Sequence, residues 1–188
     1  MKKTDESIWK RFQDGDERAL TDIYEAYADA LYSYGLRLTN DGPLVKDCIQ
    51  EVFIQLIDRR KALILSSCIP VYLFKSFRNK LVEELRGSNR RQDILKLLYK
   101  EATVEGHAEQ SLIDDEERQA VQKDIQMAMD RLTDRQREVI YLKYNKDFDC
   151  QEIAELLGID KASVSTLLYR SIKLMRKAFL EKMVSIQP

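Results

Sequence analysis

The sequence is poor in the residues that build disulfide frameworks and metal sites. Its 188 residues include three cysteines and one histidine. Cys48, Cys68 and Cys150 are an odd number at long, irregular spacings, which fits reduced thiols and gives neither a disulfide framework nor a zinc site. His107 has no cysteine or carboxylate at a metal-ligand spacing, and we read it as an exposed linker residue. We therefore expect no metal and no cofactor.

Long apolar runs and catalytic motifs are missing as well. A run such as 62–65 is far too short to span a bilayer, and the N-terminus leads into no apolar stretch, so we expect a cytoplasmic protein. The sequence has no strand-like alternation, no phosphate-binding glycine loop, no Ser/His/Asp set and no Glu-x-x-His pair. It gives no support to an enzymatic function, and we expect no small-molecule substrate.

Charge is abundant but strongly segregated along the chain, although the net charge is only −1. Residues 75–91 hold six lysines and arginines against two glutamates, and residues 161–182 hold six against one. Residues 101–130 lie between them and hold nine carboxylates against two basic residues. Two basic patches on either side of an acidic connector indicate a bipartite nucleic-acid binder.

Apolar residues at helical spacing predict a helical N-terminal half. One predicted helix ends at Gly15, and the others run from Glu17 to Thr39, from Pro43 through Asp58 and from about Val71 to Gly87. The apolar stripe expected on the helix at 43–58 is Leu44, Val45, Cys48, Ile49, Val52, Phe53, Leu56 and Ile57. The apolar stripe expected on the helix at 71–87 is Leu73, Phe74, Phe77, Leu81 and Leu85. The helix at 17–39 carries an aromatic seam that we assign to core packing. On the helix at 71–87, basic residues alternate with aromatics, which suits single-stranded nucleic acid. A solvated face is an equally good interpretation of that segment alone.

Residues 132–179 have the pattern of a helix-turn-helix. Thr133 or Asp134 is placed to cap a first helix, and a second helix at 151–157 ends at Gly158 in a left-handed conformation. Asp160 then caps a third, basic and hydroxyl-rich helix. The first-helix positions that we expect to face a core are Val139, Ile140, Leu142 and Tyr144.

An ordinary helical hairpin in a bundle is the alternative to this interpretation. The small Ala154 at the expected crossing point, the glycine turn and the polar third helix together favour DNA binding. In the third helix, we expect Val164, Leu168 and Ile172 to pack on the first two helices.

From residue 8 to residue 180, the chain resembles a bacterial sigma factor of the sigma-70 family, in the small extracytoplasmic-function (ECF) group. Residues 47–56, DCIQEVFIQL, resemble region 2.2, and residues 72–86 resemble regions 2.3 and 2.4. Residues 132–139, LTDRQREV, and 152–159, EIAELLGI, resemble region 4. The first of these two runs also resembles the DNA-binding module of LuxR-type regulators, so region 4 alone does not decide the family.

The resemblance implies an all-α protein with two small helical domains joined by an acidic linker. Sigma region 2 is expected at 5–92, the linker at 93–127 and the region 4 helix-turn-helix at 128–182. The implied function is that of an alternative sigma factor, which binds core RNA polymerase and directs promoter-specific initiation without catalysing a reaction.

The resemblance also assigns residues to each part of that function. Docking on the β′ subunit of polymerase carries over to Asp47, Gln50 and Glu51. Asn79 matches the asparagine that holds a flipped base when the −10 element is melted. The neighbouring backbone contacts are assigned to Lys75, Arg78, Lys80 and Arg86. Contacts to the −35 element are assigned to Lys161, Ser163, Ser165, Thr166, Leu167, Tyr169, Arg170 and Lys173.

The partners implied in this way are core polymerase through β′ and β, promoter DNA, and an anti-sigma factor of the kind that is often membrane-anchored. We expect a monomer when the protein is free. Three departures prevent the promoter preference from being carried over: Glu83-Glu84 near the −10 residues, an unusually apolar loop at 62–71, and Ser165-Thr166-Leu167 where relatives commonly have Lys-Ser-Arg.

Two other functions remain open at this point. One is a helix-turn-helix regulator that binds duplex operators without polymerase, and the other is a helical adaptor that binds only proteins. The basic patches disfavour the adaptor, and the region 2.2 and 2.4 motifs disfavour the regulator.

Overall fold

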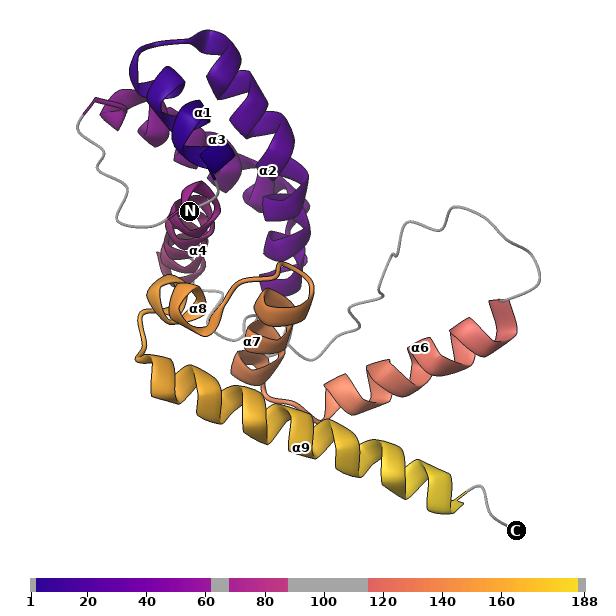
Figure 1. The fold of residues 1–188 in the computed structure, drawn as a ribbon. Coiled ribbons are helices and arrows are strands. Elements are labelled where there is room, and N and C mark those ends of the chain that lie inside the picture. Colours follow the sequence, from indigo (N-terminus) through magenta and orange to yellow (C-terminus); the bar gives the residue numbers. More distant parts are fainter. Residues whose placement is uncertain (1–2, 62–67, 88–114, 186–188) are drawn as a thin grey trace. The chain divides into compact units, whose positions relative to one another are not determined.

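The computed structural model describes residues 3–61, 68–87 and 115–185, which form two compact units within residues 1–102 and 103–188. The described residues are helices and their connections, with no strand among them (Figure 1). The predicted all-α fold is confirmed. His107, Arg90, Arg91 and residues 62–67 of the predicted loop at 62–71 lie outside the described part of the chain, and residues 69–71 of that loop belong to a helix.

The first unit contains α1 (Lys3–Gln13), α2 (Glu17–Leu38), α3 (Gly42–Arg59) and α4 (Ile69–Gly87). Gly15, with φ of +94°, lies just after the end of α1, where the sequence predicts that the first helix stops. The side chain of Asp16 caps α2 by accepting from the backbone N–H of Arg18 at 2.9 Å. Asp41 caps α3 by accepting from the backbone N–H of Leu44 at 3.0 Å. Helix α4 begins two residues before the predicted start, because proline is tolerated in a first helical turn and Pro70 lies there.

Helices α2, α3 and α4 pack around one core. The large side chains buried in this core are Ile23, Leu31, Tyr34, Leu56, Leu73, Phe74, Phe77 and Leu81. Gly35 lets α2 approach the other two helices closely, since an added Cβ would lie 2.6 Å from Val45 Cγ1 and 2.8 Å from Phe77 Cζ. The predicted aromatic seam is only partly in this core, because Tyr24 is 47% exposed and meets the edge of Phe53.

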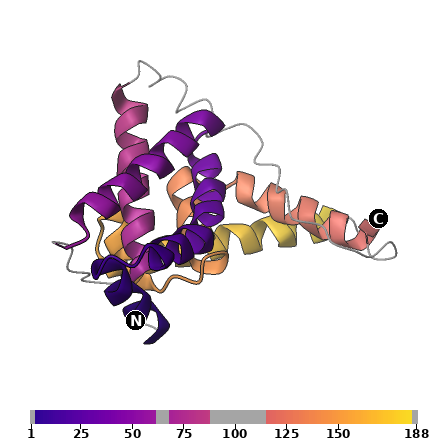
Figure 2. The same ribbon diagram turned by 90° about the horizontal axis from the view of Figure 1, so that it is seen from above.

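The second unit contains α6 (Asp115–Asp130), α7 (Asp134–Tyr144), α8 (Cys150–Leu157) and α9 (Lys161–Ser185). Helices α6, α7 and α8 each pack on α9. In Figure 1, the C-terminal end of α6 meets α9 and the two helices spread apart from there, and Figure 2 shows the same helices from above. An ion pair between Arg131 and Glu181 joins the end of α6 to α9. The core side chains come from α7, α8 and α9: Val139, Leu142, Ile153, Leu156, Val164 and Leu168.

Two predicted core positions of this unit are wrong. Tyr144 is 59% exposed, because it is the last residue of α7. Ile172 is 45% exposed, and Ser171 takes the buried place with its hydroxyl donating to the Leu167 carbonyl at 2.7 Å. The reason is helical geometry: position i+7 returns to within about 20° of position i, whereas i+8 is turned away by about 80°. None of the helices in the described ranges has both the length and the apolar character that a membrane span needs.

Candidate nucleic-acid interface

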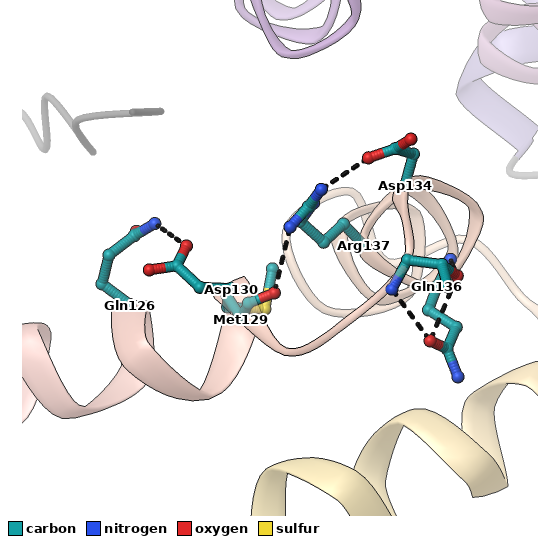
Figure 3. A network of polar contacts seen from close by, with 7 residues as sticks. Gln126, Met129, Asp130, Asp134, Gln136 and Arg137 are labelled. Carbon is teal, nitrogen blue, oxygen red and sulfur yellow. Dashed lines mark hydrogen bonds and ion pairs between the residues drawn. The ribbon is translucent and has the colours of Figure 1, made fainter. Parts of the chain in front are cut away.

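The helix-turn-helix begins at a capping box around Thr133 (Figure 3). The Gln136 backbone N–H donates to Thr133 Oγ1 at 3.4 Å, and the Thr133 backbone N–H donates to Gln136 Oε1 at 3.0 Å. Arg137 donates to the Met129 carbonyl at 3.3 Å and pairs with Asp134, so it ties the start of α7 to the end of α6 (Figure 3). Of the two predicted candidates, Thr133 is the cap and Asp134 is the first residue of α7.

The second helix is fixed at both ends. Asp149 caps α8, accepting from the N–H groups of Glu152 and Gln151 at 2.9 and 2.6 Å, and these bonds hold the pKa of Asp149 below its usual value. At the other end, Gly158 has φ of +65° and ψ of +39°, the left-handed stop that the sequence predicts. Arg135 of α7 donates to the Leu157 carbonyl at 3.0 Å, which locks the first helix to the turn.

Asp160 starts the third helix, as predicted. Its carboxylate accepts from the Ser163 hydroxyl at 2.6 Å and from the Ser163 N–H at 2.7 Å, and these bonds hold the pKa of Asp160 below its usual value. The Ser165 hydroxyl donates to the Lys161 carbonyl at 3.1 Å. Both serines predicted to contact DNA therefore use their hydroxyl protons within α9, and their oxygens remain as acceptors.

Helix α9 has two clearly different faces. Val164, Leu168 and Ser171 are buried in the second unit. The predicted −35 residues that are exposed are Lys161, Ser165, Thr166, Tyr169, Arg170 and Lys173. Ser163 and Leu167 are half-buried at the boundary between the faces. The exposed residues carry three positive charges and a tyrosine ring that is 67% exposed, a surface suited to phosphates and base edges.

The polar face of α4 lies opposite a buried apolar stripe. The stripe is the one predicted from the sequence: Leu73, Phe74, Phe77, Leu81 and Leu85. On the polar side, Asn79 and Arg86 are exposed, whereas Lys75, Arg78 and Lys80 are half-buried. An exposed carboxamide beside basic side chains can hydrogen-bond a base edge while its neighbours meet phosphates.

The exposed face of α3 is longer than the sequence suggests. Asp47, Gln50 and Glu51 are exposed, opposite the buried stripe of this helix. Ile54 is 56% exposed and Ile57 is 40% exposed, and both continue the same face by one and two turns. The sequence placed Ile57 in the core stripe, and that placement is wrong. Phe53, three residues after Gln50, is buried, whereas Ile54, four residues after Gln50, is exposed. Spacing along the helix alone does not predict which of the two side chains is buried, because the neighbouring helices decide it.

A network of ion pairs connects α3 to α4. Lys80 Nζ lies 2.6 Å from Glu51 Oε2 and 2.7 Å from Glu84 Oε1. Hydrogen bonding to Glu51 and then to Glu84 raises the pKa of Lys80. Lys80 and Glu84 are four residues apart on one helix, a pairing readable from the sequence, but the contact with Glu51 requires the packed helices.

The buried cysteine of α3 and the arrangement of metal-ligating residue types bear on redox and metal chemistry at this interface. Cys48 is buried in α3, and burial raises the pKa of its thiol to about 11, so it is an uncharged core residue at neutral pH. Over the ranges that the structure describes, no three His, Cys, Asp or Glu side chains gather as a metal site.

A fully capped helix-turn-helix with an exposed, basic third helix defines the class: a helix-turn-helix DNA-binding protein, with a second helical unit in the same chain. Comparison with known families agrees with both parts. Residues 23–91 match the family described as "Sigma-70 region 2", and residues 122–175 match the family described as "Sigma-70, region 4".

Curated relatives extend the likeness over most of the chain. It is 28% identical over 160 residues to "ECF RNA polymerase sigma factor SigX" of Bacillus subtilis (strain 168), with 82% of this chain and 80% of that protein covered. It is 24% identical over 178 residues to "ECF RNA polymerase sigma factor SigW" of the same organism, with 89% and 92% covered.

Solved structures share the fold. The structure of CnrH, determined in complex with the cytosolic domain of CnrY, gives a TM-score of 0.62 at 17% identity, with 95% of this chain and 97% of that chain covered. The sigma factor RpoE from Bartonella quintana, determined in complex with the anti-sigma factor NepR, gives 0.61 at 18% identity, with 85% and 95% covered.

The chain therefore belongs to the sigma-70 family of RNA polymerase sigma factors, in its ECF group. It is an alternative sigma factor, a transcription initiation factor that binds core RNA polymerase and directs transcription from promoters. The resemblance seen in the sequence is confirmed.

Proposed function

We propose that the two units divide promoter recognition between them. Residues 5–92 form region 2, which holds polymerase and opens the −10 element, and residues 128–182 form region 4, which reads the −35 element. Residues 93–127 connect them, and α6 begins within this connector. The observation that carries the proposal is the division of α9 into a buried face and an exposed basic face.

In region 4, α9 enters the −35 major groove with its exposed face. Arg170 is the side chain best suited to a base edge, because a guanidinium can bond guanine with two N–H groups. Lys161 and Lys173 lie about three and a third turns apart on the helix and contact phosphates. Ser163, Ser165, Thr166, Leu167 and Tyr169 complete the surface between them.

In region 2, α4 contacts the melted −10 strand. The exposed carboxamide of Asn79 holds the edge of a flipped base through one donor and one acceptor. Lys75, Arg78 and Arg86 contact the backbone on either side. Lys80 differs from these three because its ammonium is held by two carboxylates.

Polymerase is bound through the exposed face of α3, where Asp47, Gln50 and Glu51 meet the β′ subunit, while region 4 meets the β subunit. The protein has no catalytic residues of its own, takes no cofactor or small molecule, is a monomer when free and acts in the cytoplasm. An anti-sigma factor, anchored in the membrane or free, holds it inactive. The complex of RpoE with the anti-sigma factor NepR supports this last assignment.

Transcription in vitro tests the proposed function. Core polymerase alone and core polymerase with this protein are given genomic fragments, and transcript 5′ ends are mapped. We expect a small set of discrete start sites only when the protein is present, with a shared sequence about 10 and about 35 base pairs upstream. Binding of the protein to duplex operators with no effect on core polymerase would contradict the proposal.

A further inference from the structure

An ion-pair network joins the surface that is proposed to bind polymerase to the helix that is proposed to bind the −10 strand. Its centre is Lys80 on α4, with Nζ 2.6 Å from Glu51 Oε2 on α3 and 2.7 Å from Glu84 Oε1 one turn away. The Lys80 side chain is 20% exposed, whereas those of Glu51 and Glu84 are 48% and 42% exposed. Lys80 is thus the least exposed of the three side chains.

This arrangement is poorly suited to a phosphate. One ammonium between two carboxylates leaves a net charge of −1 at this point of the surface, and Glu83, which is exposed, adds another negative charge next to it in sequence. A phosphate approaching Lys80 has to displace at least one carboxylate, whereas Arg86 on the same helix is exposed. Lys80 is therefore a weaker phosphate ligand than Arg86.

We propose that Lys80 is a positioning residue of the polymerase-docking surface: it holds the Glu51 carboxylate in the orientation that polymerase binds, and it does not contact DNA. The inference rests on the proposed function of α3 and α4, and it reassigns Lys80 from the surface that binds DNA to the surface that binds polymerase.

The geometry explains how a residue of α4 acts on docking. Lys80 occupies Oε2 of Glu51, and Oε1 is left to accept a hydrogen bond from a donor on polymerase. A long, exposed glutamate loses rotamer freedom when a partner immobilises it. Since Lys80 has already fixed Glu51, less freedom is lost on binding. Glu84 holds the ammonium from the other side and keeps it against α3.

Two measurements on the full-length protein separate the two roles of Lys80. The first is the Kd for core polymerase, from the anisotropy of labelled protein. The second is the salt dependence of holoenzyme binding to a promoter with a pre-melted −10 bubble. We expect Lys80→Gln to raise the Kd for core polymerase about threefold to tenfold, the range that corresponds to freezing one long side chain. The slope of log affinity against log salt should stay unchanged.

Matched variants show whether the effect passes through Glu51. Lys80→Arg, which can bridge the same carboxylates, should restore core binding. In a Glu51→Gln background, Lys80→Gln should cause no further loss. Arg86→Gln should lower the salt slope by about one unit and leave the Kd for core unchanged. Lys10→Gln removes a positive charge from the exposed side of α1 and should change neither quantity.

The opposite pattern overturns the inference. If Lys80→Gln lowers the salt slope by about one unit and leaves core binding unchanged, Lys80 is a phosphate contact. An equal loss of core binding with and without Glu51 also contradicts it. Melting curves show whether each variant folds, and Lys80→Met, which keeps the apolar stem, replaces Lys80→Gln if that variant unfolds. Failure of the wild-type protein to bind core polymerase would instead refute the proposed function.

Discussion

At the scale of single residues, exposure decides which of the basic and polar side chains are available to DNA. Asn79, Arg86 and Arg170 are exposed, so each can reach a ligand without displacing a neighbour's packing. The Ser163 hydroxyl donates to the Asp160 carboxylate that caps α9, so it supports the start of the helix. A polar residue at a recognition position thus has two possible roles, and the hydrogen bond in the free protein tells them apart.

Asn79→Ala should slow open-complex formation on linear promoters and leave binding to core polymerase intact. The exposed carboxamide is lost, but the buried stripe of α4 is unchanged. A promoter with a pre-melted −10 bubble should partly restore the rate, because the backbone contacts survive. The measurement is the rate of heparin-resistant complex formation on both templates. Equal impairment on the two templates would make Asn79 a structural residue.

Arg170→Ala and Lys173→Ala should affect −35 recognition in different ways. Arg170→Ala should relax discrimination at one −35 position, at a cost of about 1–3 kcal/mol if its contact with guanine has two hydrogen bonds. Lys173→Ala should weaken all promoters alike and lower the salt slope by about one unit. Selection from a promoter library, followed by salt titration of the selected sites, checks both. The prediction fails if the two variants change the preferred −35 sequence in the same way.

At the scale of elements, the sequence contains the signals that start and end helices, whereas packing sets the distances between helices. Gly35 illustrates the effect of packing on these distances. It is buried in the last turn of α2, where alanine would be the better helix former, and it is there because α3 and α4 leave no room for a Cβ. Helices α3 and α4 also pack against each other, and this brings Glu51 within reach of Lys80.

Gly35→Ala should destabilise the first unit. The added Cβ would meet two Val45 methyl carbons and the Phe77 ring within 3.0 Å, and overpacking of this kind costs about 1–3 kcal/mol. That loss exceeds the gain of about 1 kcal/mol in helix propensity. Gly87→Ala on α4 is the matched control, because an added Cβ there would meet nothing within 4 Å. Urea unfolding followed by circular dichroism checks both, and equal midpoints would contradict the prediction.

The caps of the helix-turn-helix should make the second unit sensitive to acid. The folded-state pKa values of Asp149 and Asp160 are lowered, by the Glu152 N–H and the Ser163 hydroxyl respectively. Such groups stabilise the fold above their unfolded pKa, near 4, and that contribution is lost as the pH falls through the lower folded value.

The Asp149→Asn/Asp160→Asn variant should therefore lose less stability than the wild type between pH 5 and pH 3. Asparagine caps a helix about as well as aspartate but does not titrate in this range. Melting temperatures at a series of pH values check the expectation, with Asp29→Asn, an exposed position on α2, as the control. Parallel curves for the three proteins would show that the caps carry no pH dependence.

At the scale of the whole molecule, each unit has its own core and its own basic surface. The buried side chains of α1 to α4 and those of α6 to α9 form separate sets, and each set lies within one of the two units. A chain of this kind can change one binding surface without disturbing the fold of the other unit. Polymerase docking and −35 recognition should therefore respond to separate mutations.

Asp47→Lys should weaken binding to core polymerase and leave the melting temperature of the protein unchanged. Asp47 is exposed on α3, on the same face as Gln50, but it takes no part in the Lys80 ion pairs. A substitution of Asp47 therefore tests docking alone, whereas Glu51→Lys would also bring two ammonium groups together. Asp29→Lys is the charge-matched control. Equal retention of core polymerase by both variants in a pull-down would remove α3 from the docking surface.

The sequence by itself determined the helices, the caps and the family. Thr133, Gly158 and Asp160 act through neighbours a few residues away, so their roles can be read without the fold. The buried stripe of α4 could be predicted for the same reason, because spacings of three and four along one helix depend only on the helix. The family follows from motifs that are themselves short and local.

The tertiary structure decided what depends on packing between helices. Helical periodicity predicted that Ile57 and Ile172 are buried in the core, but both side chains are exposed. The neighbouring helices set the width of a buried face. The pairing of Lys80 with Glu51 joins residues 29 positions apart, and it exists only because α3 and α4 pack against each other. The sequence shows that a residue is charged, but only its three-dimensional neighbours determine whether that charge is available to a partner.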